Sequence, residues 1–192
     1  MNESRRIEYM PLAELRADPR NPKGHDTSTI EASIDRFGYL EPIVVDGRTG
    51  LIVSGHGRVK TLTARRARGE APPEGVVEQE GGAWLVPVVS GWSSRSDVDA
   101  AAALVALNRT TELGGWVDDA LLGLLDGLAE EDDGLVGVGY TGGDLDHLRD
   151  LLGADDSEDG EDDGESGVFD ADPSLRGAID VECPACGHAF TA

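Results

Sequence analysis

The residues of this chain best suited to chemistry lie in one glycine-rich segment, Gly55-His56-Gly57-Arg58. A β-branched stretch ends just before this segment, and a helical pattern follows it. The N-terminus of a helix leaves backbone N–H groups unpaired and carries a partial positive charge, and glycine lets an anion come close. Arg58 and Lys60 would add cationic donors. The segment is therefore predicted to bind an anion such as a phosphate, although ordinary strand-to-helix turns show the same pattern.

His56 is the candidate for a catalytic role, because histidine titrates near neutral pH and Arg58 follows two positions later. Phosphate contact, general-acid catalysis and a plain turn position are all compatible with this residue. A nuclease would also need carboxylates that converge on a metal ion. The nearby carboxylates all occupy turn-like segments, where acidic residues are common: Asp18, Asp26, Glu41 and Asp46. Hydrolysis of a nucleotide or of DNA, with His56 and Arg58 as catalytic residues, is therefore one alternative function.

The two cysteines of the chain, Cys183 and Cys186, are three positions apart, and His188 follows closely. Two thiolates on a glycine-containing turn are typical of half a tetrahedral zinc site. His188 could be a third ligand, and a fourth could come from Asp180, Glu182, a second copy or a partner protein. In a reducing compartment this spacing favours zinc over a structural disulfide. A zinc-knuckle-like tail is the prediction, and an unmetallated tail is the alternative.

Charge is distributed unevenly along the chain. Residues 1–70 contain 12 Lys and Arg against 10 Asp and Glu, whereas residues 71–192 contain 4 against 28. The formal net charge of −22 is therefore almost wholly C-terminal. A charge this negative repels nucleic acid at long range and excludes a simple basic DNA-coating protein. Any contact with DNA would be local and made by the N-terminal part.

Strands and helices are expected to alternate around the glycine-rich segment. Four strands are predicted from β-branched and apolar runs, at residues 7–10, 42–45, 51–54 and 84–90. The Asp46-Gly47 dipeptide predicts a hairpin turn with a positive φ between the second and third strands. Five helices are predicted from apolar residues at helical spacing, at residues 28–37, 58–68, 96–108, 117–128 and 143–152. This order predicts an α/β (α+β) fold with a small mixed sheet and packed helices.

Two of these helices carry explicit end signals. Ser28 begins a capping box for the first helix, in which Ile30, Ile34 and Phe37 share a face and which ends at Gly38. Ser96 is the expected N-cap of the third helix.

Residues 154–173 contain ten acidic residues and no basic ones. Such a segment cannot bury enough apolar surface to offset its ordering entropy, so a solvated linker is expected. The longest apolar run, residues 100–107, is far short of the roughly 20 residues that span a bilayer, and no signal-peptide pattern is present. We therefore expect a cytoplasmic protein without membrane contact. The predicted organisation is a folded domain at 7–92, a helical extension packed on it at 93–152, an acidic disordered linker at 153–176 and the zinc-knuckle-like tail at 177–192.

Five short segments follow one another in an order that is known from one protein family. They are Pro-Leu-Ala-Glu-Leu at 11–15, Asp-Pro-Arg-Asn-Pro at 18–22, Phe-Gly at 37–38, Pro-Ile-Val-Val at 42–45 and Ile-Val-Ser-Gly-His-Gly-Arg at 52–58. Together they resemble the ParB/sulfiredoxin-like N-terminal domain of partition proteins, sulfiredoxin and many phage proteins. The Gly-His-Gly-Arg version is similar to a phage and plasmid subgroup, the ParB-like "nuclease" domain proteins, often found beside or fused to DNA methyltransferases. Further similarities at 106–109, 112–116 and 139–140 extend the resemblance over about residues 7–152.

This resemblance implies a nucleotide site with CTP or ATP and Mg²⁺ as cofactors. The residues that it assigns to the nucleotide or phosphate are Gly55, His56, Gly57, Arg58, Lys60, Asn21, Lys23, Asn108 and Arg109. Asn21 and Lys23, together with His25, belong to the loop that closes over the nucleotide in the family.

The chain also departs from the family pattern at informative positions. In the partition-protein box Gly-Glu-Arg-Arg-x-Arg, His56 replaces the glutamate and Gly57 replaces the first arginine. Leu107 stands where the family has a metal-holding glutamate, which argues against CTP hydrolysis. His56 also replaces the reactive cysteine of sulfiredoxin, so reduction of sulfinic acids is not expected. No helix-turn-helix with a basic recognition helix follows.

The favoured function is that of a ParB-like accessory protein of phage or plasmid type in a bacterial host cell. It would bind a nucleotide or a nucleic-acid phosphate at the glycine-rich segment and act in DNA metabolism. DNA, a second copy of the chain, and a phage or DNA-modification protein are the candidate partners. One alternative is a protein-interaction adaptor that displays the zinc knuckle on the acidic linker to a terminase or methyltransferase, and the other is a weak nucleotide hydrolase or nuclease.

Overall fold

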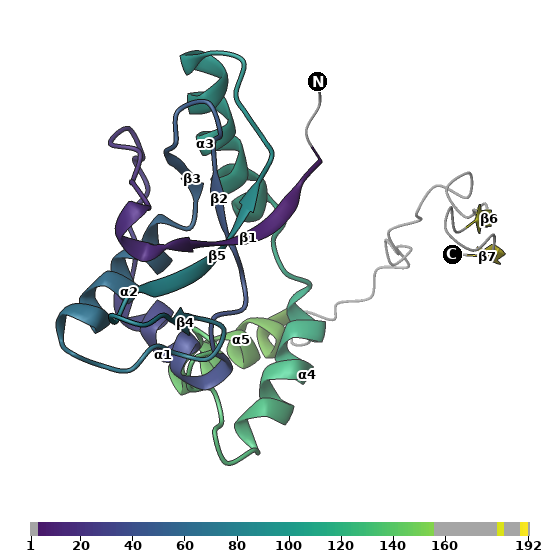
Figure 1. Ribbon diagram of the computed structural model, residues 1–192. Helices are drawn as coiled ribbons and strands as arrows, with labels where there is room; N and C mark the ends of the chain where they lie inside the picture. Colours follow the sequence, from purple (N-terminus) through teal and green to yellow (C-terminus); the bar gives the residue numbers. More distant parts are fainter. Residues whose placement is uncertain (1–3, 156–179, 183–188, 192) are drawn as a thin grey trace. The chain divides into compact units, whose positions relative to one another are not determined.

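The structure, a computed structural model, describes residues 4–155, 180–182 and 189–191 (Figure 1). It divides into two units, Met1–Asp155 and Asp156–Ala192. The described part of the second unit is an antiparallel pair of strands, β6 (Asp180–Glu182) and β7 (Ala189–Thr191). Most of the predicted linker and the three proposed zinc ligands lie outside the described residues. Everything below concerns the first unit.

A small mixed sheet forms the centre of the first unit. Its strands lie in the order β1 (Arg6–Pro11), β5 (Trp84–Ser90), β2 (Ile43–Val45) and β3 (Ile52–Ser54), and the short β4 (Val77–Glu78) also pairs with β5. The β2–β5 pair is parallel, whereas the other pairs are antiparallel. The predicted α/β fold with a small mixed sheet is therefore confirmed. The two-residue β4 was not predicted, because so short a strand leaves no apolar alternation to detect.

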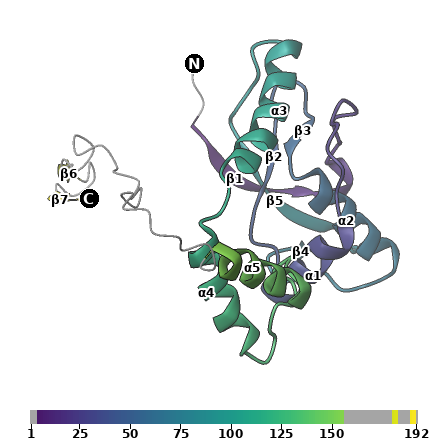
Figure 2. The ribbon, with the colours of Figure 1, turned by 180° about the vertical axis from the view of Figure 1, so that it is seen from behind.

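The helices surround this sheet (Figures 1 and 2). They are η1 (Leu12–Glu14), α1 (Thr27–Phe37), α2 (His56–Ala67), α3 (Asp97–Leu113), α4 (Asp118–Ala129) and α5 (Gly142–Asp155). α1 and α2 contact each other, and their apolar side chains meet the sheet in the main core. α3 packs on β3 and contributes no side chain to this core. This arrangement places the start of α2 directly after the end of β3.

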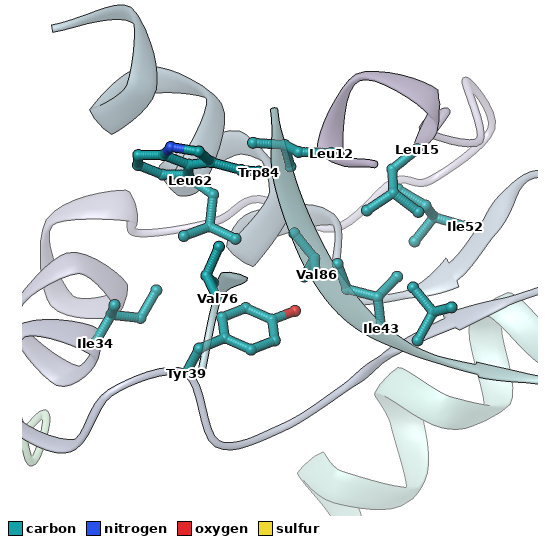
Figure 3. Close-up of a cluster of buried hydrophobic side chains, with 11 residues drawn as sticks. Leu12, Leu15, Ile34, Tyr39, Ile43, Ile52, Leu62, Val76, Trp84 and Val86 are labelled. Atoms are coloured by element: carbon teal, nitrogen blue, oxygen red, sulfur yellow. The ribbon is translucent and has the colours of Figure 1, made fainter. Parts of the chain in front are cut away.

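The main core combines side chains from the sheet with side chains from α1 and α2 (Figure 3). Ile43, Ile52 and Val86 from the sheet and Leu62 from α2 are almost completely buried. Burying a side chain of this size stabilises a fold by about 1.5–3 kcal/mol. Leu62 therefore holds the start of α2 firmly against the strands that precede it.

A second apolar cluster joins α4 and α5 around Leu121, Leu125 and Leu145. The connection between these helices is tied to α1, because the guanidinium of Arg36 donates to the backbone carbonyls of Gly134 and Val136, at 2.8 and 2.6 Å. The predicted helical extension thus contacts the sheet domain through α1. Its separation at residue 92 as a distinct domain stays a prediction.

The predicted capping box at Ser28 is wrong. The N-cap of α1 is Asp26, whose carboxylate accepts hydrogen bonds from the backbone N–H groups of Ser28 and Thr29, at 3.0 and 3.2 Å. A carboxylate is a stronger acceptor at a helix N-terminus than a hydroxyl, since it also interacts with the helix dipole. Phe37, near the end of α1, is 41% exposed, and the Arg36 guanidinium lies 4.9 Å from its ring centroid.

The turn between β2 and β3 also differs from the prediction, because its positive φ lies at Gly50 (66°) and not at Gly47. Asp46 is buried and acts through its carboxylate, which accepts from the backbone N–H and the hydroxyl of Ser94, both at 2.8 Å, and from the Thr49 hydroxyl. Burial alone would raise the pKa of Asp46, but these hydrogen bonds outweigh it and lower the pKa. Asp46 therefore stabilises the turn as an anion.

Candidate functional site

The start of α2 has free backbone donors. Gly55 is the N-cap, in the left-handed conformation with φ 101° and ψ 15°, and no side chain caps the helix. The first helical hydrogen bond runs from the N–H of Val59 to the carbonyl of Gly55, at 3.0 Å. The N–H groups of His56, Gly57 and Arg58 have no acceptor within the described part of the chain. Three donors at the positive end of a helix dipole form a ready anion site.

Both glycines of the segment are required by their surroundings. A Cβ atom at Gly55 would lie 2.9 Å from Cγ1 of Ile43, and φ at Gly55 is one that other residues rarely adopt. A Cβ atom at Gly57 would lie 2.7 Å from Cδ1 of Ile30 and 3.0 Å from Cγ of His25. Gly57 therefore lets the helix start lie directly against the His25 ring.

The free donors face a pocket of about 360 Å³. The loop before α1, α1 itself, the segment after α1, the start of α2 and α3 all contribute to its lining. Its polar lining residues include Lys23, His25, Tyr39, Glu41, Arg58 and Asn108. Apolar side chains of Ile30, Ile34 and Leu40 complete one side, so the pocket offers both a polar end and an apolar wall.

His56 is held in one tautomer by the loop that precedes α1. Its Nε2 atom lies 3.2 Å from the backbone nitrogen of Asp18, whose N–H donates to it. Because Nε2 accepts this hydrogen bond, the ring proton must be on Nδ1. Burial lowers the pKa of His56, and the nearby His25 lowers it further. His56 is therefore a neutral donor at neutral pH.

His25 is stacked on His56, with ring centroids 6.3 Å apart and an interplanar angle of 8°. The Asn21 amide nitrogen lies 3.3 Å from Nε2 of His25, and the Lys23 backbone N–H donates to the amide oxygen, which sets the orientation of the amide. An amide nitrogen only donates, so Nε2 of His25 accepts and Nδ1 carries the proton. Burial, followed by the charges of Lys23 and Lys60, lowers the pKa of His25.

The loop that holds His56 depends on a buried carboxylate. Asp18 is almost completely buried, and its two carboxylate oxygens accept from Nε and Nη2 of Arg20, at 2.9 and 2.6 Å. This bidentate pair lowers the pKa of Asp18, with the hydrogen bonds from Arg20 as the main cause. Asp18 and Arg20 thus act as positioning residues for His56. From the sequence, Asp18 was considered only as a carboxylate in a turn and as part of the segment 18–22, because nothing in the sequence shows that this segment reaches α2.

The two cations that line the pocket are paired with carboxylates. Arg58 forms an ion pair with Glu41, and Nζ of Lys23 lies 3.5 Å from a carboxylate oxygen of Glu112. The Arg58 side chain is 14% exposed, whereas that of Glu41 is 76% exposed. Ion pairs whose carboxylate is open to solvent are worth only about 0–1 kcal/mol, so an incoming anion can displace the carboxylates of Glu41 and Glu112.

The structure separates the predicted site residues into groups. Those lining the pocket are Lys23, Gly55, His56, Gly57, Arg58 and Asn108. Asn21 acts through His25, as described above. Lys60 and Arg109 do not line the pocket, and Arg109 lies 3.4 Å from Glu112 in an ion pair. The sequence analysis missed Tyr39 as a lining residue and considered Glu41 only as a turn carboxylate.

The described residues contain no cluster of metal-binding side chains. No group of three or more His, Cys, Asp or Glu side chains there could hold a metal ion. Glu41 supplies a carboxylate to the pocket, but it is paired with Arg58. Cys183, Cys186 and His188 lie outside the described residues.

The mixed sheet, the paired helices and the open start of α2 define a small α/β domain with an uncapped helix N-terminus. Among solved structures, the chain resembles the C-terminally truncated chromosome-partitioning protein ParB from Caulobacter crescentus, which was solved in complex with CTP-γ-S. The TM-score is 0.51 at 18% sequence identity, and the match covers 77% of this chain and 78% of that one. A Pnob8-like ParB-N domain has a TM-score of 0.39 at 12% identity, with 80% and 64% covered. The likeness to the Caulobacter crescentus protein, at 18% identity, establishes the fold alone.

Comparisons by sequence find no relative: no protein-family profile and no curated protein matches the chain. Within the described residues, none of the helices combines the length and the apolar character needed to cross a membrane.

Proposed function

We propose that this protein binds a nucleoside triphosphate, CTP or ATP, with its phosphates at the start of α2. The observation that carries the proposal is the set of three N–H groups, at residues 56–58, that have no acceptor in the described part of the chain and border the pocket. The fold supports it, since the similar ParB from Caulobacter crescentus is a complex with CTP-γ-S. The protein would use this site as a ParB-like accessory protein in DNA metabolism.

Each part of the pocket has a defined task in this proposal. The three N–H groups bind phosphate oxygens, and the guanidinium of Arg58 and the ammonium of Lys23 neutralise the phosphate charge. The Nδ1–H groups of His25 and His56 are additional neutral donors. Mg²⁺, when bound with the nucleotide, would supply further charge neutralisation, and the free oxygen of Asn108 is the protein group suited to it. The Asn108 amide nitrogen already donates to the Leu104 carbonyl, at 2.9 Å.

A nucleotide fits the charge distribution better than DNA. Besides Arg58, the α2 residues Arg65 and Arg68 form ion pairs with acidic side chains, among them Asp35 and Glu31. Binding of the DNA backbone depends on several unpaired cations that neutralise phosphates. With its net charge of −22, the chain repels a long polyanion more strongly than a compact one. The site therefore suits a small phosphorylated ligand.

Hydrolysis is not part of this proposal. Protonation of His56 would place a proton on Nε2, which already accepts a hydrogen bond from the backbone N–H of Asp18. Two N–H groups would then face each other, so the ring is poorly placed to act as a general acid. The adaptor hypothesis depends on residues outside the described part of the chain and stays a prediction.

Isothermal titration calorimetry on the full chain tests the proposal with CTP, ATP and a short DNA duplex as ligands. We expect the wild type to bind at least one of the nucleotides, and Arg58→Ala to bind it about 10 to 100 times more weakly, as for loss of a charge-assisted hydrogen bond. Arg66→Ala is the matched control, because Arg66 lies on the same helix but donates to the Gly82 carbonyl, outside the pocket. Absence of nucleotide binding by the wild type, or binding of the duplex alone, would refute the proposal.

A further inference from the structure

The hydroxyl of Tyr39 is buried without a hydrogen-bond partner. Tyr39 follows α1, is 6% exposed, and its backbone N–H donates to the carbonyl of Glu74 at 2.7 Å, which fixes its position. Its ring packs in the main core, yet its hydroxyl oxygen has neither donor nor acceptor nearby in the described residues. Buried polar groups are nearly always paired, so an unpaired one calls for an explanation.

This hydroxyl lies at the border between the core and the pocket. Tyr39 lines the pocket, and Figure 3 shows its hydroxyl pointing toward Ile43. A Cβ atom at Gly55 would lie 2.9 Å from Cγ1 of Ile43, so Ile43 packs against the glycine-rich segment. Tyr39 and the glycine-rich segment line the same pocket, and the hydroxyl points toward a side chain that contacts this segment.

The charged groups of the pocket act on the same hydroxyl. Burial raises the pKa of Tyr39 well above its ordinary value. The charge of Arg58 lowers this pKa slightly, and the charge of Glu41 raises it slightly. The hydroxyl is consequently protonated at neutral pH and available as a donor. Any ligand group that reaches it lies close to Arg58, where an anionic oxygen is the most favourable acceptor.

We propose that the Tyr39 hydroxyl is a ligand-binding group that donates a hydrogen bond to a phosphate oxygen of the nucleotide. This inference rests on the proposed function and adds a specific contact to it. The bound phosphate then completes the hydrogen bonding of a hydroxyl that the described residues leave unpaired. Tyr39 holds the phosphate from the core side, while the N–H groups of residues 56–58 hold it at the start of α2.

Thr61 provides a matched control for Tyr39. Its hydroxyl is also buried and has no hydrogen-bond partner among the described residues, but it lies within α2 and does not line the pocket. The variants Tyr39→Phe and Thr61→Val each remove one such hydroxyl and preserve the shape of the side chain. Only Tyr39→Phe should affect a ligand.

The experiment measures binding of CTP, inorganic triphosphate and cytidine to the full chain, together with thermal unfolding of the ligand-free proteins. We expect Tyr39→Phe to weaken binding of both CTP and triphosphate about tenfold, as for loss of one hydrogen bond to a charged acceptor, and Thr61→Val to bind like the wild type. Without ligand, Tyr39→Phe should unfold at the same temperature as the wild type or up to about 4 °C higher, because it removes an unpaired buried group.

Different failures lead to different conclusions. If the wild type binds neither CTP nor triphosphate, both the proposed function and this inference are wrong. If the wild type binds and Tyr39→Phe retains full affinity, the inference alone is wrong. If Tyr39→Phe loses affinity for CTP but not for triphosphate, the hydroxyl contacts the base or the ribose. If ligand-free Tyr39→Phe unfolds at a lower temperature than the wild type, the hydroxyl is already paired within the protein. Either result overturns the phosphate contact.

Discussion

Replacement of Glu41 by glutamine is expected to tighten nucleotide binding. The Glu41 carboxylate pairs with Arg58 at the pocket, so it occupies the guanidinium that a phosphate needs. Because its side chain is 76% exposed, the carboxylate can turn into solvent when a ligand binds, but its negative charge stays close to the phosphates. Glutamine removes the charge and leaves the size of the side chain nearly unchanged.

The size of the effect follows from simple electrostatics. Two unit charges about 6 Å apart in water interact by roughly 0.7 kcal/mol, and a triphosphate with about three nearby charges would experience roughly 2 kcal/mol of repulsion. Physiological salt, with a Debye length of about 8 Å, reduces this to about 1 kcal/mol, which corresponds to about fivefold in affinity. Because the Glu41 carboxylate is open to solvent, loss of the Arg58–Glu41 pair should change the free energy of unfolding by no more than about 1 kcal/mol.

Titration calorimetry with CTP at low and high NaCl concentration measures this effect. The gain in affinity of Glu41→Gln should be about fivefold at physiological salt, should be larger at low salt, and should fall below about twofold at high salt, as screening removes the charge effect. Glu31→Gln is the matched control, since Glu31 pairs with Arg68 of α2, does not line the pocket, and its replacement changes the net charge equally. An equal gain for Glu31→Gln, or no gain for Glu41→Gln, would show that the Glu41 carboxylate does not compete with the ligand.

Three further predictions concern the start of α2 and the start of α1. Gly57→Ala should remain folded but bind CTP at least about tenfold more weakly in calorimetry, because its Cβ would lie 3.0 Å from the His25 ring; full affinity would contradict the close packing at this site. Gly55→Ala should lower the free energy of unfolding, measured in urea, by about 2–4 kcal/mol, because Gly55 has a φ of 101° and its new Cβ would lie 2.9 Å from Ile43. Gly69 has a φ of 76° but open space around it, so Gly69→Ala should lower the same free energy by only about 1 kcal/mol. Equal losses in the two variants would refute the role of the contact. The pKa of Asp26 is lowered to about 2, mainly by the hydroxyl of Ser28. The Asp26 carboxylate should therefore stabilise the fold fully above about pH 4, the ordinary pKa of an aspartate, and this stabilisation should disappear as the pH falls through about 2. Urea unfolding at several pH values should show this loss in the wild type and not in Asp26→Asn, and identical profiles would rule out Asp26 as its source.

Local patterns were enough to predict most elements of the fold. The predicted strand at residues 84–90 coincides with β5, because buried Trp84, Val86 and Val88 alternate with less buried neighbours along it. Ser96 is the N-cap of α3, as predicted, and its hydroxyl accepts from the N–H of Asp99. Such signals act within a few residues, so they are visible in the sequence.

Errors arose where two local signals competed. Asp26 and Ser28 are both good N-cap residues, and only the folded chain shows that the carboxylate caps α1. Gly47 and Gly50 lie in the same turn, and the one with positive φ is Gly50. At Gly47 the constraint is space, since a Cβ there would lie 2.7 Å from Oγ of Ser93. That contact joins positions far apart in the sequence.

The sequence by itself determined the glycine-rich segment, the strand before it and the helix after it, because backbone conformation and helix-end chemistry depend on neighbouring residues. Only the tertiary structure decided which side chains surround the free N–H groups. It brings Asp18 to His56, Glu41 to Arg58, and Tyr39 to the lining of the pocket. These contacts join separate loops and helices, and their geometry follows from how the core packs, which no local pattern encodes.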